Sequence, residues 1–284
     1  MTHSAPRTTT TVIEPDARFF DLKLRELWNY RDLVLLLVRR DFVAQYAQTV
    51  LGPLWHVLQP LLTTVIFTIV FGNVAKIPTD GVPPFLFYMA GVVAWSYFSS
   101  VLSSTATTFL ANAHVFGKVY FPRLVMPLAT VVSRLIAFSI QFLLFLSVLA
   151  WFLAGGAAVQ PNAAVLLTPL LLVMLGALAL GLGVCVSAVT TRYRDLAVVV
   201  GFGVQLLMFV SPVFYPLSVV PDKWRVWALA NPVTSILEAF RYAYFGTGHL
   251  DFAALLYSAG TITFIVMASV LLFNRVERTF IDTV

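Results

Sequence analysis

Six long apolar runs, separated by shorter polar stretches, set the hydrophobic pattern of the chain. A helix needs about 20 mostly apolar residues to cross the hydrocarbon core of a bilayer, which is about 30 Å thick. The runs are continuous rather than alternating, which is typical of membrane helices and not of a membrane β-barrel. The pattern therefore predicts six transmembrane helices, over residues 54–74, 85–110, 124–153, 163–189, 196–214 and 252–273.

Composition supports the same fold class, an all-α membrane protein. Of the 284 residues, 60% are hydrophobic and only 11% are charged, against about 25% charged in soluble domains. The single cysteine, Cys185, lies inside an apolar run, which excludes a disulfide framework and a cysteine metal site. The N-terminal stretch is polar and lacks the apolar run of a cleaved signal peptide. Residues 1–26 are therefore expected to form a flexible cytoplasmic N-terminus.

The distribution of basic residues predicts the orientation, because Lys and Arg favour cytoplasmic segments. If the N-terminus is inside, the inner segments hold most of the 18 Lys and Arg residues. The outer segments then hold only Lys76, Lys223, Arg225 and Arg241. Both termini are therefore expected in the cytoplasm, and residues 215–251 outside.

The charges inside the predicted spans limit how transport could be driven. The spans contain no Asp, Glu or Lys and one arginine, Arg134. Transporters driven by protons or sodium usually carry carboxylates within the membrane. The chain also lacks the GxxxxGK[ST] phosphate loop of an ATPase. The four histidines show no metal-ligand spacing, so no metal site is predicted. Any uphill transport would take its energy from a partner.

Two cytoplasmic segments have the pattern of contact elements. Residues 27–52 contain an apolar core too short to span, flanked by Arg31 and the Arg39–Arg40 pair, which predicts an amphipathic helix in the interface plane. This helix is either a docking surface or a membrane anchor. Residues 111–123 include Tyr120-Phe121-Pro122 between basic residues, which predicts a short, rigid projection. That loop either inserts into a groove of a partner or rests on lipid headgroups.

Six sequence motifs carry a resemblance to a known family. They are VRRDFVAQYAQTVLGPLWHVLQPLL, GKVYFPRLVMPL, YRDL, SPVFYP, NPVTSILEAFRY and the tail ERTFIDTV. In this order they resemble the membrane subunits of ABC-type polysaccharide exporters, which move lipid-linked O-antigen, capsule or teichoic acid chains. The likeness covers nearly the whole chain from about residue 30 onward.

The resemblance implies a homodimeric half-transporter in a bacterial inner membrane. Two copies of this six-span subunit would associate with two ATP-binding cassette subunits, which bind the ATP and Mg, while this chain binds no cofactor. Short re-entrant helices would lie on the outer side, within residues 215–251. The loop at residues 111–123 would be the coupling loop that receives the motion of the ATPase. The residues expected at this interface are Arg39, Arg40, Asp41, Lys118, Tyr120, Phe121 and Arg123.

Aromatic and hydroxyl residues are the candidates for the translocation path. A sugar chain presents apolar C–H faces as well as polar edges, so ring faces and hydroxyls suit it better than fixed charges. Tyr97 and Ser100 are three residues apart and are expected to share one helix face. Phe71 and Tyr215 lie at span ends and are candidate outer-gate residues. In the outer region, Glu238 and Arg241 are expected to pair, one helical turn apart.

The function predicted from these observations is ATP-driven export of lipid-linked polysaccharide, most specifically O-antigen, across the inner membrane. Membrane lipid and the polysaccharide are the other expected partners, and no nucleic acid is. Alternatives are a capsule, teichoic acid, drug or lipid exporter of the same fold, an intramembrane acyl- or glycosyltransferase, and a passive channel.

Overall fold

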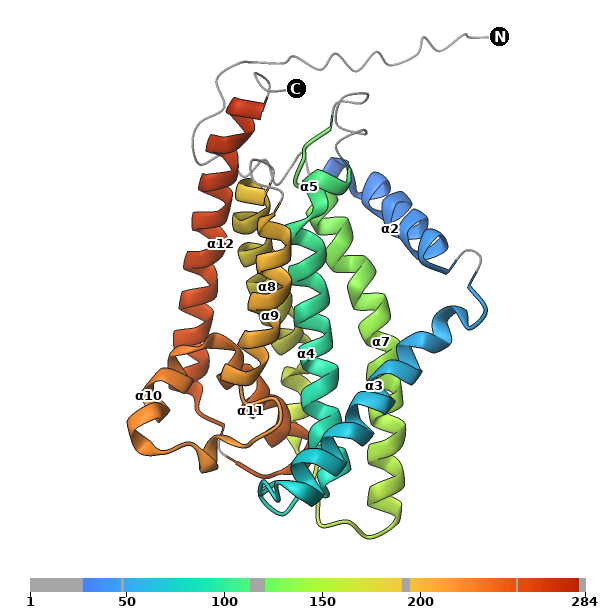
Figure 1. The fold of residues 1–284 in the computed structure, drawn as a ribbon, viewed down its shortest axis with the longest axis vertical. Helices are drawn as coiled ribbons and strands as arrows, with labels where there is room; N and C mark the ends of the chain where they lie inside the picture. Colours follow the sequence, from blue (N-terminus) through green and yellow to red (C-terminus); the bar gives the residue numbers. More distant parts are fainter. Residues whose placement is uncertain (1–27, 47–48, 113–120, 191–194, 249, 281–284) are drawn as a thin grey trace, which may run out of the picture.

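The computed structural model describes residues 28–46, 49–112, 121–190, 195–248 and 250–280. The N-terminus 1–26 and the coupling-loop residues Lys118 and Tyr120 lie outside these ranges. Within them all regular structure is helical, as the hydrophobic pattern predicts (Figure 1).

Five helical stretches of the described chain are long and apolar enough to cross a bilayer. The first, Gly52–Val74, consists of a 3-10 turn, α3 (Trp55–Phe67) and π-helical turns over Thr68–Val74. The others are α4 (Pro84–Ala106), α7 (Val125–Ala154), a stretch from Ala163 that continues as α8 (Thr168–Thr190), and α12 (Phe252–Phe280), which is apolar through Phe273. These five confirm five of the predicted apolar helices.

The remaining predicted span is shorter than expected. α9 covers Leu196–Val210, 15 residues, which corresponds to a rise of about 22 Å. It ends because Ser211 precedes Pro212, and a residue before proline is pushed out of the helical region. Ser211 accordingly has φ −87° and ψ 145°. The prediction that the helix continues to residue 214 is therefore wrong.

α4 is the central helix of the bundle. It packs against α3, α7, α8 and α9, and it is buried along most of its length. Its largest fully buried side chains include Phe87, Tyr88 and Phe98. α3 and α9, in contrast, present much of their surface outward, and no residue of α9 is buried.

Small residues on α8 allow two neighbours to approach closely. A Cβ on Gly183 would lie 2.6 Å from the Thr105 Cβ on α4, and one on Gly181 would lie 3.1 Å from Ile265 on α12. In lipid, close backbone approach replaces the hydrophobic effect as a source of helix association. α8 therefore joins α4 to α12.

Two short helices, α10 (Asp222–Ala230) and α11 (Pro232–Phe245), lie at the end of the bundle opposite to α2 (Arg31–Tyr46) and α5 (Thr108–Ala111) (Figure 1). α11 begins where the Asn231 side chain accepts a hydrogen bond from Val233 N, and Pro232 suits a first helical position. It ends at Gly246, whose φ of 72° is left-handed.

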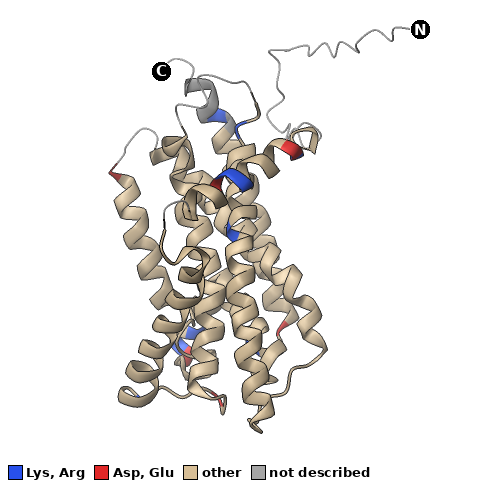
Figure 2. Ribbon diagram, turned by 90° about the vertical axis from the view of Figure 1, so that its right-hand side faces the viewer, with Lys and Arg blue, Asp and Glu red and all other residues tan. Residues whose placement is uncertain are grey.

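Charged residues are sparse along the middle of the bundle (Figure 2).

Candidate functional site

A cavity of about 350 Å³ runs along α3, between that helix, α4 and α7. Ser96, Ser99 and Ser100 face it from α4, because residues three and four apart share one helix face. The Ser96 hydroxyl donates to Gln141 Oε1 of α7 at 2.7 Å. The other polar lining residues include Gln45, His56, Gln59, Thr63, Tyr97 and Arg134.

Apart from the basic side chains of Arg134 and His56, the lining suits a polar, uncharged ligand. Hydroxyls and amides both donate and accept hydrogen bonds, and no carboxylate lines the cavity. Trp95 and Phe67 add aromatic surface. The described residues contain no group of His, Cys, Asp or Glu arranged to hold a metal ion. The cavity therefore resembles a binding surface rather than a catalytic centre.

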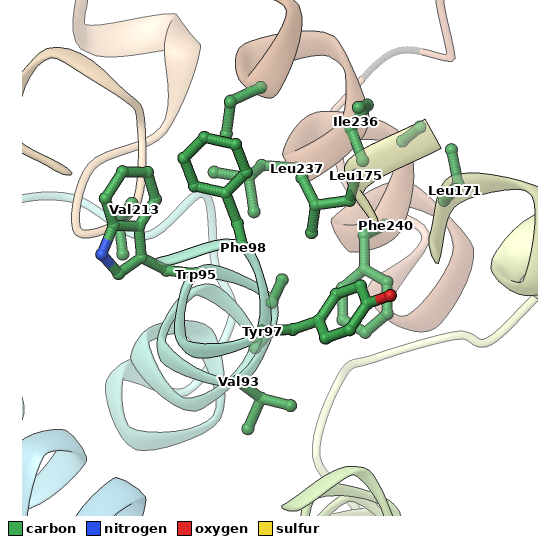
Figure 3. Close-up of a cluster of buried hydrophobic side chains, with 14 of the residues drawn as sticks. Val93, Trp95, Tyr97, Phe98, Leu171, Leu175, Val213, Ile236, Leu237 and Phe240 are labelled. Atoms are coloured by element: carbon green, nitrogen blue, oxygen red, sulfur yellow. The ribbon is translucent and has the colours of Figure 1, made fainter. Parts of the chain in front are cut away.

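Tyr97 and Ser100 of the predicted stripe both line the cavity, but Tyr97 is also buried in the helix packing. Ser100 is half-buried, whereas Tyr97 is only 3% exposed. Its ring packs against Phe138 with centroids 5.2 Å apart. In Figure 3, Tyr97 and Trp95 leave α4 on different sides, with Trp95 directed towards Val213. The Tyr97 ring therefore supports the helix packing beside the cavity.

The two candidate outer-gate residues, Phe71 and Tyr215, meet in one aromatic cluster. Phe71 stacks on Phe214 with centroids 4.5 Å apart, and Phe214 lies edge-on to Tyr215 at 5.3 Å. The Tyr215 hydroxyl donates to the carbonyls of Phe209 and Val210 at 3.3 and 3.1 Å. These carbonyls belong to the last turn of α9, which has no helical partners for them. The cluster therefore fixes the end of α9 against the π-helical turns that follow α3.

Glu238 and Arg241 form the expected pair, with Arg241 Nη1 donating to Glu238 Oε1 at 3.1 Å. The Arg241 side chain is 4% exposed, and its guanidinium carbon lies 4.0 Å from the centre of the Phe87 ring. It also donates to the carbonyls of Val213 (2.7 Å) and Tyr215 (3.2 Å). The pair therefore anchors the non-helical segment after α9 to α11.

At the opposite end of the bundle, α2 packs against the first turns of α7. Leu37 and Val38 of α2 are buried there. Their partners are Phe121, Val125, Met126 and Ala129. The Phe121 side chain is 6% exposed, so in this structure its ring contacts α2 rather than projecting outward. Leu36, which lies on the apolar side of the predicted amphipathic helix, is 62% exposed.

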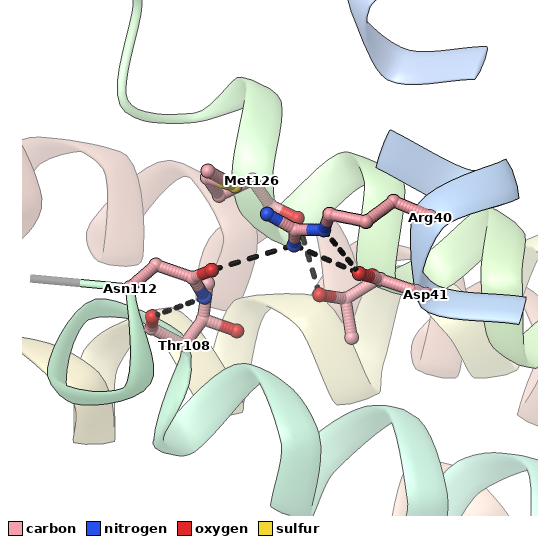
Figure 4. A network of polar contacts seen from close by, with 6 residues as sticks. Arg40, Asp41, Thr108, Asn112 and Met126 are labelled. Atoms are coloured by element: carbon pink, nitrogen blue, oxygen red, sulfur yellow. Dashed lines mark hydrogen bonds and ion pairs between the residues drawn. The ribbon is translucent and has the colours of Figure 1, made fainter. Parts of the chain in front are cut away.

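Arg40 and Asp41 belong to a polar network beside this cluster (Figure 4). Arg40 donates to Asp41 Oδ1 through Nε (3.0 Å) and Nη2 (2.8 Å). The same Nη2 is 3.4 Å from Asn112 Oδ1, and Asn112 in turn donates to the Thr108 carbonyl at 2.9 Å. Arg39 is exposed and Arg123 half-buried. The network joins α2 to the turn after α5, immediately before the segment predicted to be the coupling loop.

Sequence reasoning missed the amides and basic groups that line the cavity. Gln59 and Gln141 lie inside predicted spans, where an amide needs a polar partner. His56 and Arg134 face the same space. Polar residues within apolar runs were a signal that could have found this site, but only the fold shows that α3 and α7 bring them together.

Comparison with known proteins supports the motif-based resemblance. The family described as ABC-2 type transporter matches residues 32–245. An O-antigen export system permease protein of Klebsiella pneumoniae is 27% identical over 88% of this chain and 94% of its own length. One of Myxococcus xanthus is 29% identical over 92% and 98%. A polysialic acid transport protein of Escherichia coli is 24% identical over 72% and 78%.

These matches confirm the predicted family. In ABC transporters of this kind the membrane subunit carries the transport path and a separate partner subunit hydrolyses ATP. The membrane helices, the polar cavity and the family match over residues 32–245 agree: the chain belongs to the ABC-2 type transporter family, as a membrane subunit.

Proposed function

We propose that the chain is the transmembrane subunit of an ATP-driven exporter that moves lipid-linked polysaccharide, most specifically O-antigen, from the cytoplasmic to the outer face of a bacterial inner membrane. One observation carries this proposal: relatives named O-antigen export permeases align with nearly the full length of both chains. The cavity lining of hydroxyls, amides and ring faces is compatible with sugar.

A capsule-type polymer is the second candidate substrate. The supporting observation is the similarity to a polysialic acid transport protein, which has a lower identity and a smaller coverage. Complementation separates the two. The gene should restore surface O-antigen to a strain lacking its O-antigen permease, and should not restore a capsule to a strain lacking its capsule permease.

The working exporter is proposed to contain two copies of this chain. The cavity lies beside α3, and both α3 and α9 leave apolar side chains exposed, among them Leu62, Ile66 and Phe202. If two copies met along α3 and α9, their cavities would face a common path between the bundles. Ser100 would line this path, and Phe71 and Tyr215 would stand at its outer end.

Two ATPase subunits are proposed to contact the end of the bundle that carries α2. The contact would combine the exposed Arg39 with the Arg40–Asp41 pair, Arg123 and the loop residues Lys118 and Tyr120. Phe121 would act from inside, because it packs α2 onto α7. A push on the coupling loop would then reach both helices.

The proposed orientation places both termini in the cytoplasm, and α10 and α11 outside as the re-entrant elements. In a Cys185→Ser background, a cysteine replacing Lys223 should react with an impermeant thiol reagent in intact cells. A cysteine replacing Arg31 should react only after the membrane is opened. Both native side chains lie at exposed positions, so access is set by the membrane alone. The reverse labelling pattern would contradict the orientation.

Export is expected to depend on hydrolysis by the partner and not on ion gradients, because the spans contain no carboxylate to carry a coupling ion. Replacing the phosphate-loop lysine of the partner ATPase should abolish surface polysaccharide. Collapsing the proton gradient while ATP is maintained should leave export largely intact. Export that continues with the inactive ATPase but stops without the gradient would refute the proposed energy source.

A further inference from the structure

One end of the cavity holds two basic side chains, each with one buried nitrogen that lacks a partner. Arg134 Nε and His56 Nε2 are buried, and neither has a hydrogen-bond partner in the described part of the chain. No carboxylate of the described residues lies within ion-pair distance of Arg134. A buried donor without a partner is costly, and more so when it is charged. The Nε of Arg134 therefore has an unmet requirement for an anion or for water.

These groups lie near the end of the bundle that carries α2. Arg134 is nine residues after Val125, the first residue of α7, or about 13 Å along that helix. His56 is the second residue of α3, and its ring lies edge-on to Tyr46 in the last turn of α2 at 5.6 Å. α2 has the pattern of an interfacial helix. This end of the cavity therefore lies where α2 turns into the membrane.

The lining of the cavity changes character along its length. At the α2 end it carries Arg134, His56 and the amide of Gln45, and no acidic residue lines it. Further along α4 come the hydroxyls of Ser96 and Ser100. A phosphate is the anion that a membrane lipid offers at this depth, and the guanidinium fork matches its geometry in a two-point contact.

We propose that Arg134 and His56 bind the phosphate of a membrane lipid at the α2 end of this cavity. The inference rests on the proposed function for the identity of the lipid: in the exporter it is the carrier, whose phosphate or diphosphate is joined to the glycan. The phosphate occupies the basic end, and the first sugars lie along the serine face of α4. The two orphan groups thereby select the end of the substrate that all chain lengths share.

Lipid binding to the purified complex of this chain with its ATPase partner, in a phosphate-free maltoside detergent, tests the site. Three probes are added in series and counted by native mass spectrometry: a polyprenyl diphosphate, the corresponding polyprenol, and phosphatidylglycerol. Arg134→Met should raise the half-saturating concentration of the diphosphate at least tenfold, because it removes a charged two-point contact. His56→Phe, which keeps the ring against Tyr46, should raise it about threefold. Binding of the polyprenol should not change.

Arg225→Met is the matched control, since Arg225 is exposed on the outer helix α10. It should bind all three probes like the wild type. If the Arg134 and His56 variants lose binding of the diphosphate alone, the ligand is the carrier. If they lose binding of phosphatidylglycerol equally, the site accepts the phosphate of any membrane lipid. Unchanged binding by both Arg134→Met and His56→Phe overturns the site, as does a polyprenol that binds the wild type as tightly as the diphosphate.

Export of polysaccharide, assayed in parallel, keeps the two proposals apart. A chain that binds diphosphate through Arg134 but restores no polymer contradicts the proposed function and leaves the site intact. If both variants export normally and bind the diphosphate as the wild type does, the result contradicts the phosphate site alone. If Arg134→Met does not assemble with the ATPase, His56→Phe still decides the result.

Discussion

Arg241→Met is expected to destabilise the protein by about 3–5 kcal/mol, the range for removing one partner of a buried ion pair. The substitution leaves the Glu238 carboxylate without its cation and the carbonyls of Val213 and Tyr215 without their donor. Removal of the guanidinium also ends its contact with the Phe87 ring. For a chain of this size the midpoint of thermal unfolding should fall by roughly 10 °C, measured in detergent by the loss of monodisperse protein.

Two controls locate the effect at this anchor. Arg225→Met removes an exposed arginine at the same end of the bundle and should change the midpoint little. Gly91→Ala should destabilise the same place from the other side, since its Cβ would lie 2.2 Å from the Val213 carbonyl oxygen and 3.2 Å from Arg241 Nη2. Gly201→Ala, with open space around its Cβ, is the matched glycine. Equal midpoints for Gly91→Ala and Gly201→Ala would show that the segment after α9 is not held there.

Ser100→Trp should reduce polysaccharide export at least tenfold while the complex still assembles. Ser100 is half-buried and faces the cavity, so a bulky ring would fill space that the sugar chain needs. The fold should survive, because the native hydroxyl donates only to the Tyr97 carbonyl, one turn earlier in the same helix. The measurement is surface polysaccharide per assembled complex in cells, together with ATP hydrolysis by the purified complex.

The matched variant is Ser139→Trp on α7. Ser139 is exposed and also bonds only within its own helix, to the Leu135 carbonyl. The Ser139→Trp variant should export polysaccharide at the wild-type level. Normal export by Ser100→Trp, from a complex as abundant as the wild type, would remove the cavity from the proposed path. Loss of export in both variants would indicate a general sensitivity to bulky residues.

The helices were predictable from the sequence because crossing a bilayer demands long apolar runs, and five of them appear near the expected positions. The end of α9 was missed because apolar residues continue past Pro212, and the proline outweighs the hydrophobic pattern. The pairing of Glu238 with Arg241 follows from their spacing on one helix. The hydrogen bond from Arg241 to the Val213 carbonyl could not be predicted in this way, since it joins segments far apart in the chain.

The candidate site was predictable only in part, for a similar reason. The serine face of α4 follows from helical spacing. Tyr97, which is next to that face, also lines the cavity, but its ring is held in the helix packing because α7 brings Phe138 to it. Phe121 shows the same limit: its sequence neighbours suggest a projecting loop, but α2 covers it. Which neighbour covers a given helix face is a tertiary property that a local pattern does not contain.

The central place of α4 has a consequence for how the protein is made. α4 is the least apolar of the five long helices and also the most buried. Chains emerge from the ribosome N-terminus first, so α4 enters the bilayer before α7 and α8 exist to cover it. Its serines and tyrosines then face lipid, where polar side chains are poorly accommodated. Stable integration of α4 is therefore expected to depend on the helices that pack against it later, α7 and α8.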